Sequence, residues 1–175
     1  TSLLSGDLLD PLHQLEIDGL VTIIPNKGAF ITHISMQDIK ELFQLREVVE
    51  GLAAKLAVNN ISTEKLDEIN NLFIQAENEK DPARKLEMHM ESNDILHDYI
   101  FKAAGNSRLI KLDQSYHNFI KLEINLTNSI RGIVEKSNKE HTAIVEALRS
   151  GDPDKAEKAM RQYIASVFNN IMAVI

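Results

Sequence analysis

The sequence predicts a mainly α-helical protein, in which a short helix and a β-hairpin precede an antiparallel bundle of six or seven helices. Two observations support this fold class. From Ser35 onward apolar residues recur at helical spacing, and no segment alternates as a strand does. Capping residues beside proline, as at Asp81-Pro82 and Asp152-Pro153, divide this part into helices of ordinary length. We therefore expect a helical domain at 35–175 and a smaller unit at 1–34.

The composition excludes several classes of protein. The chain of 175 residues has no cysteine, which removes disulfide frameworks, thiolate zinc sites and cysteine nucleophiles and fits a cytoplasmic protein. No apolar run approaches the roughly 18 residues of a membrane-spanning helix, and no signal peptide is visible. The net charge of -7 argues against broad nucleic-acid binding, so any DNA contact should be confined to a small region.

Residues 12–34 differ from the rest of the chain. Leu12 to Glu16 predicts a short helix, and two strands follow at 21–24 and 29–32, joined by the turn Pro25-Asn26-Lys27-Gly28. The stretch LHQLEIDGLVTIIPNKGAFIT resembles the end of the winged helix-turn-helix DNA-binding domain of GntR-type regulators. The resemblance implies that Lys27, in the wing, contacts DNA. An arbitrary hairpin beside a helical domain is the alternative.

The residues before Leu12 resemble the first helix and turn of the same DNA-binding domain. A further helix and a basic recognition helix should follow TSLLSGDLLDP, and neither is present. We therefore expect roughly 25–30 residues to be missing between Pro11 and Leu12. The charge supports this interpretation, because the only base in 1–34 is Lys27 and the acids there are Asp7, Asp10, Glu16 and Asp18. DNA phosphates would repel such a unit.

Capping signals place the first helices of the bundle. Ser35 with Asp38 starts a helix over 36–59, and Ser62 starts a second one that runs to about residue 79. The third helix begins at Asp81-Pro82, with the aspartate as cap and the proline in the first turn.

The remaining helices are marked in the same way. Gly105 suits the left-handed residue that ends a helix, and Asn106 suits the cap of the next, which runs to about residue 129. Ser137 and Glu140 have the spacing of a capping box for another helix. Gly151-Asp152-Pro153 ends that helix and begins the last one.

The stretch ESNDILHDYIFKAAGNSRLI carries a second resemblance. Asn93, His97 and the run Ala103-Ala104-Gly105-Asn106 resemble the FCD ligand-binding domain of the FadR subfamily of GntR regulators. LFQLREVVEGLAAKLA and EHTAIVEALRSGDPDKAEKAMRQYI resemble the same domain. The resemblance implies a transcription regulator and not an enzyme. Its implied partners are a second copy of the chain, operator DNA and a small organic acid effector, without a membrane.

Three polar residues lie on otherwise apolar helical stripes, namely His97, His141 and Tyr163. In the family these positions match three histidines and Asn93 matches an aspartate, so the resemblance implies a divalent metal such as zinc or nickel. His97 and His141 would supply nitrogen ligands and Asn93 a weak oxygen ligand. The neutral phenol of Tyr163 would stay outside the coordination shell. This set is weaker and less charged than the family's.

Arg46, Asn93, His97, His141 and Tyr163 are the expected effector-binding residues. Arg46 has apolar neighbours on its helix, so its guanidinium could receive a ligand carboxylate in a bidentate grip. Its alternative partner is a carboxylate of its own helix, Glu50 or Glu47.

Several other possibilities remain open. Each histidine could be a core residue bonded to a neighbour, and the bundle could be purely structural. A metal-free sensor of an uncharged or amphiphilic molecule is favoured by the Asn93 and Tyr163 departures. Asp94 ranks below Asn93 as an oxygen ligand because it lies about 100° around the helix. The pair Asp113 and His117 is a reserve, and His13, His33 and His89 have no comparable context.

An enzyme has little support in the sequence. It has no glycine-rich phosphate loop, no serine nucleophile motif and no cysteine. A diiron bundle needs a glutamate three residues before a histidine, and no histidine here has one.

Overall fold

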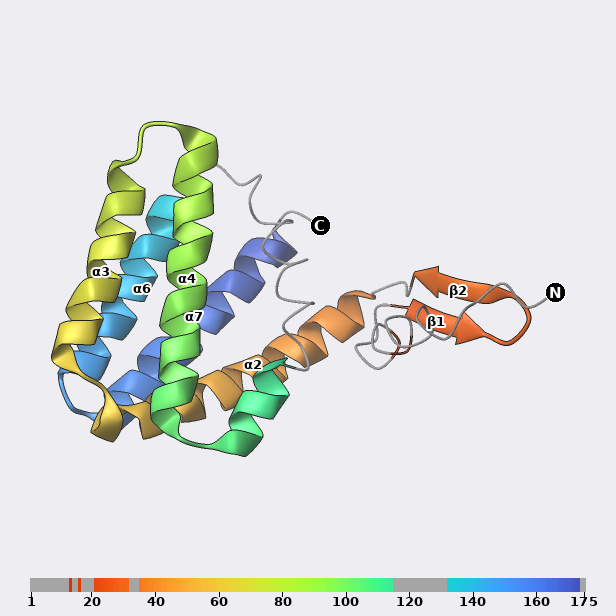
Figure 1. Ribbon diagram of the computed structural model, residues 1–175, viewed down its shortest axis with the longest axis horizontal. Coiled ribbons are helices and arrows are strands. Elements are labelled where there is room, and N and C mark those ends of the chain that lie inside the picture. Colours follow the sequence, from red (N-terminus) through yellow and green to blue (C-terminus); the bar gives the residue numbers. More distant parts are fainter. Residues whose placement is uncertain (1–12, 14–15, 17–20, 32–34, 115–131, 174–175) are drawn as a thin grey trace. The chain divides into compact units, whose positions relative to one another are not determined.

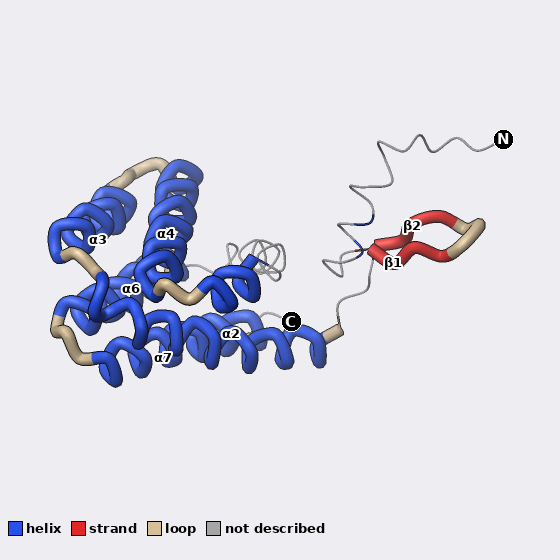
Figure 2. Tube along the Cα trace, turned by 60° about the horizontal axis from the view of Figure 1, so that its bottom comes forward, coloured by secondary structure: helices blue, strands red, loops and turns tan. Residues whose placement is uncertain are grey.

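The computed structural model describes His13, Glu16 and residues 21–31, 35–114 and 132–173. The chain divides into two units, Thr1–Ile39 and Lys40–Ile175, each described here by itself. Figure 1 labels the elements in chain order, and Figure 2 shows that the described part is helical apart from one hairpin. Among the described residues, no helix combines the length and apolar character needed to cross a bilayer.

The hairpin of the first unit confirms the predicted strands. Strand β1 (Val21–Ile24) pairs antiparallel with β2 (Gly28–Ile31), and Ile24 lies opposite Gly28. The amide of Lys27 donates to the carbonyl of Ile24 at 3.0 Å, and Asn26 has a φ of 62°. Proline followed by a residue of positive φ is typical of a type II turn. The second strand starts at Gly28, one residue earlier than predicted. Lys27 is exposed in the turn.

The first three helices of the bundle start where their caps predict. Helix α2 (Met36–Ala57) follows Ser35, whose hydroxyl accepts from the amide of Asp38 at 3.1 Å, and a short 3-10 turn, η1 (Val58–Asn60), extends it. Helix α3 (Thr63–Asn78) is capped by Ser62. Helix α4 (Pro82–Ala104) is capped by Asp81, and Gly105 ends it with a φ of 64°. Residues 107–114 begin another helix, and the predicted remainder of it lies outside the described residues.

The predicted start of the following helix is wrong. Helix α6 (Ile133–Arg149) begins directly after Gly132, so Ser137 lies inside the helix and is buried. Instead of capping a helix, the Ser137 hydroxyl lies 3.3 Å from Nδ1 of His141, and Glu140 accepts from Ser166. The last helix, α7 (Pro153–Met172), starts as predicted, with Asp152 accepting from the amides of Asp154 and Lys155.

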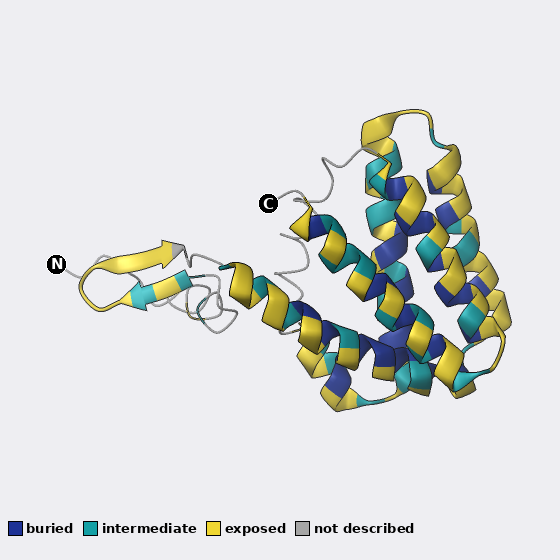
Figure 3. Ribbon diagram, turned by 180° about the vertical axis from the view of Figure 1, so that it is seen from behind, coloured by how far each residue is buried: buried dark blue, intermediate teal, exposed yellow. Residues whose placement is uncertain are grey.

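The core of the helical unit lies where the inward faces of its helices meet. Helix α3 packs against α4 and α6, α6 packs against α7, and Phe43 of α2 meets Phe168 of α7 with ring centroids 5.4 Å apart. Figure 3 shows the buried residues as stripes along these helices. Burying one large apolar side chain stabilises the fold by about 1.5–3 kcal/mol. The largest of the fully buried apolar side chains are Leu66, Ile69, Phe73, Leu96, Ile100, Ile144, Leu148, Met160, Ile164 and Ile171.

Helices α2 and α7 approach each other closely at Gly51. A Cβ atom at this position would stand 2.8 Å from Cγ of Arg161, so only glycine leaves room for the stem of the arginine. The Arg161 guanidinium lies 2.8 Å from Glu157 and 3.5 Å from Glu47, and the latter contact ties α7 to α2.

One face of α2 remains exposed although it is apolar. Its members are spaced so that they share one side of the helix. We call this face the α2 stripe, and it consists of Leu45, Val48, Leu52 and Leu56.

Candidate functional site

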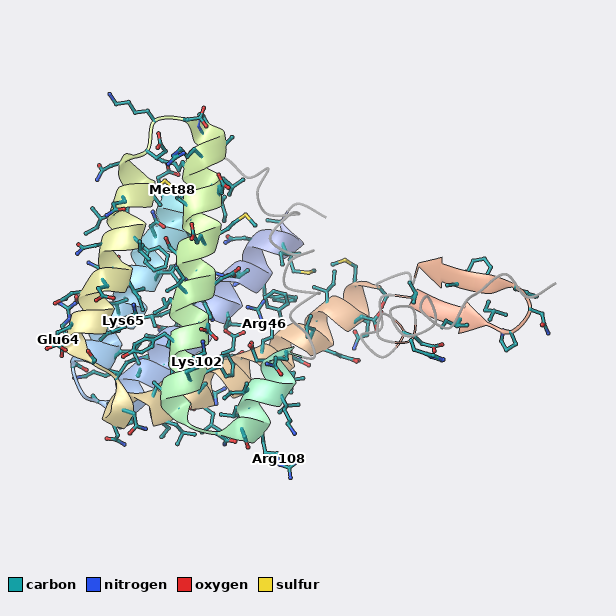
Figure 4. The ribbon with its side chains drawn as sticks, viewed as in Figure 1. Arg46, Glu64, Lys65, Met88, Lys102 and Arg108 are labelled. Atoms are coloured by element: carbon teal, nitrogen blue, oxygen red, sulfur yellow. The ribbon has the colours of Figure 1, made fainter. Side chains whose placement is uncertain are left out.

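The interior of the helical unit contains a cluster of polar side chains in a position where a bundle is usually apolar. Four helices contribute to it, and two of them contribute residues four apart, which lie on the same side of a helix. Figure 4 shows the side chains and labels Arg46 on α2. The members of this polar cluster are Arg46 and Glu50 of α2, Asn93 and His97 of α4, His141 of α6 and Tyr163 of α7.

Arg46, Glu50 and His97 form a row of polar side chains in contact with one another. The Arg46 Nε donates to Glu50 Oε1 at 2.7 Å, and the Arg46 guanidinium lies 4.9 Å from the ring centroid of Phe43. Nδ1 of His97 lies 2.8 Å from Glu50 Oε2, across from α4 to α2. Glu50 is only 1% exposed, so its charge depends on these two partners and not on water.

The neighbours of Glu50 decide its protonation state. Burial by itself would raise the pKa of this carboxyl, because a charge is poorly solvated in the protein interior. The charge of Arg46 and the contacts of the carboxylate with Arg46 and His97 outweigh burial and hold the pKa of Glu50 at about 2. Glu50 is therefore ionised at neutral pH, and Nδ1 of His97 must carry its proton to face the carboxylate.

Two buried atoms in the group formed by Arg46, Glu50 and His97 can each make a further hydrogen bond. Nε2 of His97 and Oε2 of Glu50 have no hydrogen-bond partner among the described residues. The contact between His97 and Glu50 is short enough for an ion pair, but it is not aligned as a hydrogen bond. Unpaired buried polar atoms are costly, which makes this point of the cluster the place where a ligand or an ordered water is expected.

Asn93 connects three helices through one oxygen atom. Its Oδ1 accepts from Nε2 of His141 on α6 at 3.0 Å and from the Tyr163 hydroxyl on α7 at 3.1 Å. An amide oxygen can only accept, so Nε2 of His141 carries a proton. Nδ2 of Asn93 donates to Asp94 at 3.2 Å. Both polar ends of the amide are thus engaged.

The surroundings of His141 keep it neutral. The residue is 0% exposed and stacks on Phe73 of α3, with centroids 4.6 Å apart and planes at 12°. Burial lowers its pKa well below 6.5, and the nearby charges of His97 and His89 lower it further. Because Nε2 donates to Asn93, Nδ1 of the neutral ring is the atom that accepts from Ser137.

His89 belongs to this region, although it was not among the predicted site residues. Its ring centroid lies 5.6 Å from that of His141, and its Nδ1 lies 2.7 Å from Oδ1 of Asn138. Burial lowers the pKa of His89, against the raising effect of the Asn138 bond. Sequence spacing could have predicted this, because His89 lies four residues before Asn93 and therefore on the same face of α4.

Most of the predicted site residues meet, but not all in the expected roles. Asn93, His97, His141 and Tyr163 lie together in the structure. Arg46 pairs with Glu50, and Glu47 pairs with Arg161 instead. Glu50 was predicted only as a partner for Arg46, and in the structure it also contacts His97. Asp94 is exposed. Of the reserve pair, His117 lies outside the described residues, as does His33.

The residues in this arrangement do not fit the metal that the family resemblance implies. A zinc ligand must offer a lone pair, and Nε2 of His141 instead donates its proton to Asn93. Tyr163 also donates to Asn93, which leaves Nε2 of His97 as the one imidazole nitrogen of the cluster that points to no partner in the described structure. Among the described residues, no group of three or more histidine, aspartate or glutamate side chains is placed to hold a metal.

We expect acid to destabilise the helical unit in two steps. Below pH 6.5 the unfolded chain protonates His141 while the folded chain resists, because its folded pKa is lowered, so stability falls. The stability contributed by Glu50 is complete above pH 4.5 and is lost as the pH falls from there to about 2. Urea unfolding at a series of pH values measures both steps, and the upper one should shrink in His141→Gln. A flat stability between pH 6.5 and 4.5 would contradict the neutral state of His141.

Comparison with known proteins gives a consistent result. Residues 41–166 match the family model described as FCD domain. The chain is 23% identical over 160 residues to a probable D-xylose utilization operon transcriptional repressor of Paenarthrobacter nicotinovorans, covering 90% of this chain and 68% of that protein. It is 22% identical over 185 residues to the Nta operon transcriptional regulator of Aminobacter aminovorans, covering 96% and 78%.

Solved structures show the same fold. A GntR transcriptional regulator from Rhodococcus sp. RHA1 superposes with a TM-score of 0.74 at 18% identity, covering 98% of this chain and 82% of that one. E. coli McbR/YncC gives a TM-score of 0.70 at 16% identity, covering 94% and 76%. The metal-free FCD domain of TM0439 gives 0.65 at 24% identity, covering 77% and 91%.

Proposed function

This chain belongs to the FCD domain family of GntR-type transcription regulators, and from that premise we propose that its helical unit is the sensor for a small organic acid. The acid would occupy the polar cluster at His97 and alter the DNA binding of the regulator. The observation that carries the proposal is the buried chain Arg46–Glu50–His97, with its unpaired Nε2 atom.

The group formed by Arg46, Glu50 and His97 favours an acidic ligand. The Arg46 guanidinium brings a permanent positive charge to this part of the cluster, and Nε2 of His97 is a buried ring nitrogen without a hydrogen-bond partner among the described residues. The carboxyl group of such a ligand would hydrogen-bond to Nε2 of His97 in a low-dielectric site, where hydrogen bonds that involve charged groups are strong. A hydroxyl of the same ligand could donate to Oε2 of Glu50, the other unpaired atom.

Glu50 acts in this proposal through His97. By facing Nδ1, the carboxylate keeps a proton on that atom and points Nε2 away from α2. A carboxylate behind a histidine commonly fixes the ring orientation and its protonation in this way. Arg46 in turn keeps Glu50 ionised. The expected roles of Asn93, His141 and Tyr163 are therefore indirect, because they bond to one another.

Thermal unfolding with a panel of small mono- and dicarboxylic acids tests the proposal. At least one acid should raise the melting temperature, since a ligand at 100 times its Kd adds about 2.7 kcal/mol to the stability. His97→Gln should abolish that rise. His89→Gln is the matched control on the same helix face and should retain it.

The results that would overturn the proposal are equally definite. A panel in which no acid raises the melting temperature would argue against an organic acid effector, and so would an undiminished rise in His97→Gln. If an uncharged amphiphile alone stabilises the protein, the metal-free sensor of an uncharged molecule replaces this proposal.

The first unit is the proposed contact with operator DNA. Lys27 is exposed in the turn between β1 and β2, where a phosphate contact is possible. We infer that the recognition helix belongs between Pro11 and Leu12 and that two copies of the chain present two heads to a palindromic operator. Tight and specific operator binding by the chain with the printed sequence would contradict the inferred missing segment.

A further inference from the structure

The oxygen of Asn93 lies at the centre of a hydrogen-bonded junction between helices α4, α6 and α7. It accepts at 3.0 Å from His141 and at 3.1 Å from Tyr163. Both donors are buried, with His141 0% and Tyr163 8% exposed. Removing the acceptor would thus take a hydrogen bond away from buried donors on two different helices.

This junction and a metal ion would compete for the same atoms. A cation at this point would need the lone pair of His141 Nε2, but that nitrogen carries the proton that binds Asn93. It would also displace the Tyr163 hydroxyl from its acceptor, and a neutral phenol is a poor replacement ligand. An amide oxygen brings no net charge to attract the cation, whereas a carboxylate would.

We propose that Asn93 performs the structural role of a metal centre in this chain, so that the helical unit folds and senses its ligand without a divalent cation. The amide oxygen joins the three helices by accepting from two of them. Positions 93 and 163 distinguish this junction from a metal site. An aspartate at 93 would restore a negative charge, and a histidine at 163 would restore a nitrogen lone pair. The inference does not depend on the identity of the effector.

Thermal unfolding of the dialysed protein tests the inference. In the parent protein, neither phenanthroline nor micromolar Zn²⁺ should move the melting temperature. Phenanthroline is preferred to a carboxylate chelator, because a carboxylate could occupy the proposed effector site. The double variant Asn93→Asp with Tyr163→His should melt at a lower temperature than the parent in the chelator and should gain several degrees when Zn²⁺ is added.

Cobalt gives a second readout that does not depend on stability. Tetrahedral Co²⁺ bound to the double variant should show visible absorption bands, and the parent should show none. Adding His97→Gln to the double variant should remove the bands and the Zn²⁺ effect, which excludes binding by exposed histidines.

Two results would overturn the inference. One is a parent protein whose melting temperature falls in phenanthroline or rises with Zn²⁺ as much as that of the double variant. The other is a double variant that folds but gains neither stability nor cobalt bands, because positions 93 and 163 would then not control metal binding. A smaller single substitution, Tyr163→Phe, should lower the melting temperature of the parent with and without metal alike.

Discussion

Replacing Glu50 by glutamine is expected to lower the free energy of unfolding by about 3–5 kcal/mol, since it removes one charge from a buried pair. Arg46 would keep its positive charge in a position with 3% exposure and without its carboxylate. His97 would lose the carboxylate that faces its Nδ1. Chemical unfolding followed by circular dichroism measures the loss.

Two comparisons show whether the loss comes from the buried charge. Glu146→Gln is the matched control, because Glu146 also faces an arginine, Arg149 at 3.5 Å, but its side chain is 58% exposed. It should cost no more than about 1 kcal/mol. The double substitution Glu50→Gln with Arg46→Met should cost less than Glu50→Gln alone, because it removes both charges of the pair. Equal losses of unfolding free energy in Glu50→Gln and Glu146→Gln would show that the buried pair stabilises the fold no more than an exposed pair does.

We propose that the homodimer pairs through the α2 stripe, and replacing Val48 by glutamate is then expected to give a monomer at micromolar concentration. Val48 is the most exposed member of the α2 stripe, at 52%, so the change should leave the fold of the monomer intact. In a symmetric dimer the same face of each copy meets its counterpart, so two new carboxylates would approach each other. Burying one charge without a partner costs several kcal/mol, which weakens association by orders of magnitude.

Sedimentation of the parent and two variants measures this effect. Ile74→Glu is the matched control, because Ile74 is a similarly exposed residue, at 46%, on α3 and away from the α2 stripe. It should leave the dimer unchanged. A monomeric parent would remove the dimer from the proposed function, and a Val48→Glu protein that stays dimeric would place the interface elsewhere.

The helix boundaries could be predicted wherever a local rule fixes them. Ser62, Asp81 and Asp152 cap their helices through their own side chains, a contact that spans only two or three residues. The same rule failed at Ser137, because its spacing to Glu140 fits a capping box while its side chain serves the core. A hydroxyl four residues before a buried histidine has a tertiary use that a local pattern does not reveal.

The composition of the polar cluster could be predicted, but its bonding could not. Helical periodicity placed His97, His141 and Tyr163 on inward faces, and the structure confirms that they meet. Which atom carries each proton depends on partners from other helices, such as Asn93 for His141 and Glu50 for His97. Glu50 was missed as a partner of His97 because forty-seven positions separate them in the sequence.

The close approach of α2 and α7 at Gly51 limits how this protein can evolve. A side chain at position 51 would displace the stem of Arg161 and with it the contacts to Glu157 and Glu47. Shortening residue 161 first gives up the same contacts but makes room. The cost of a larger residue at 51 therefore depends on which side chain stands at 161. Positions 51 and 161 form an epistatic pair, because the effect of a mutation at one changes with the residue at the other.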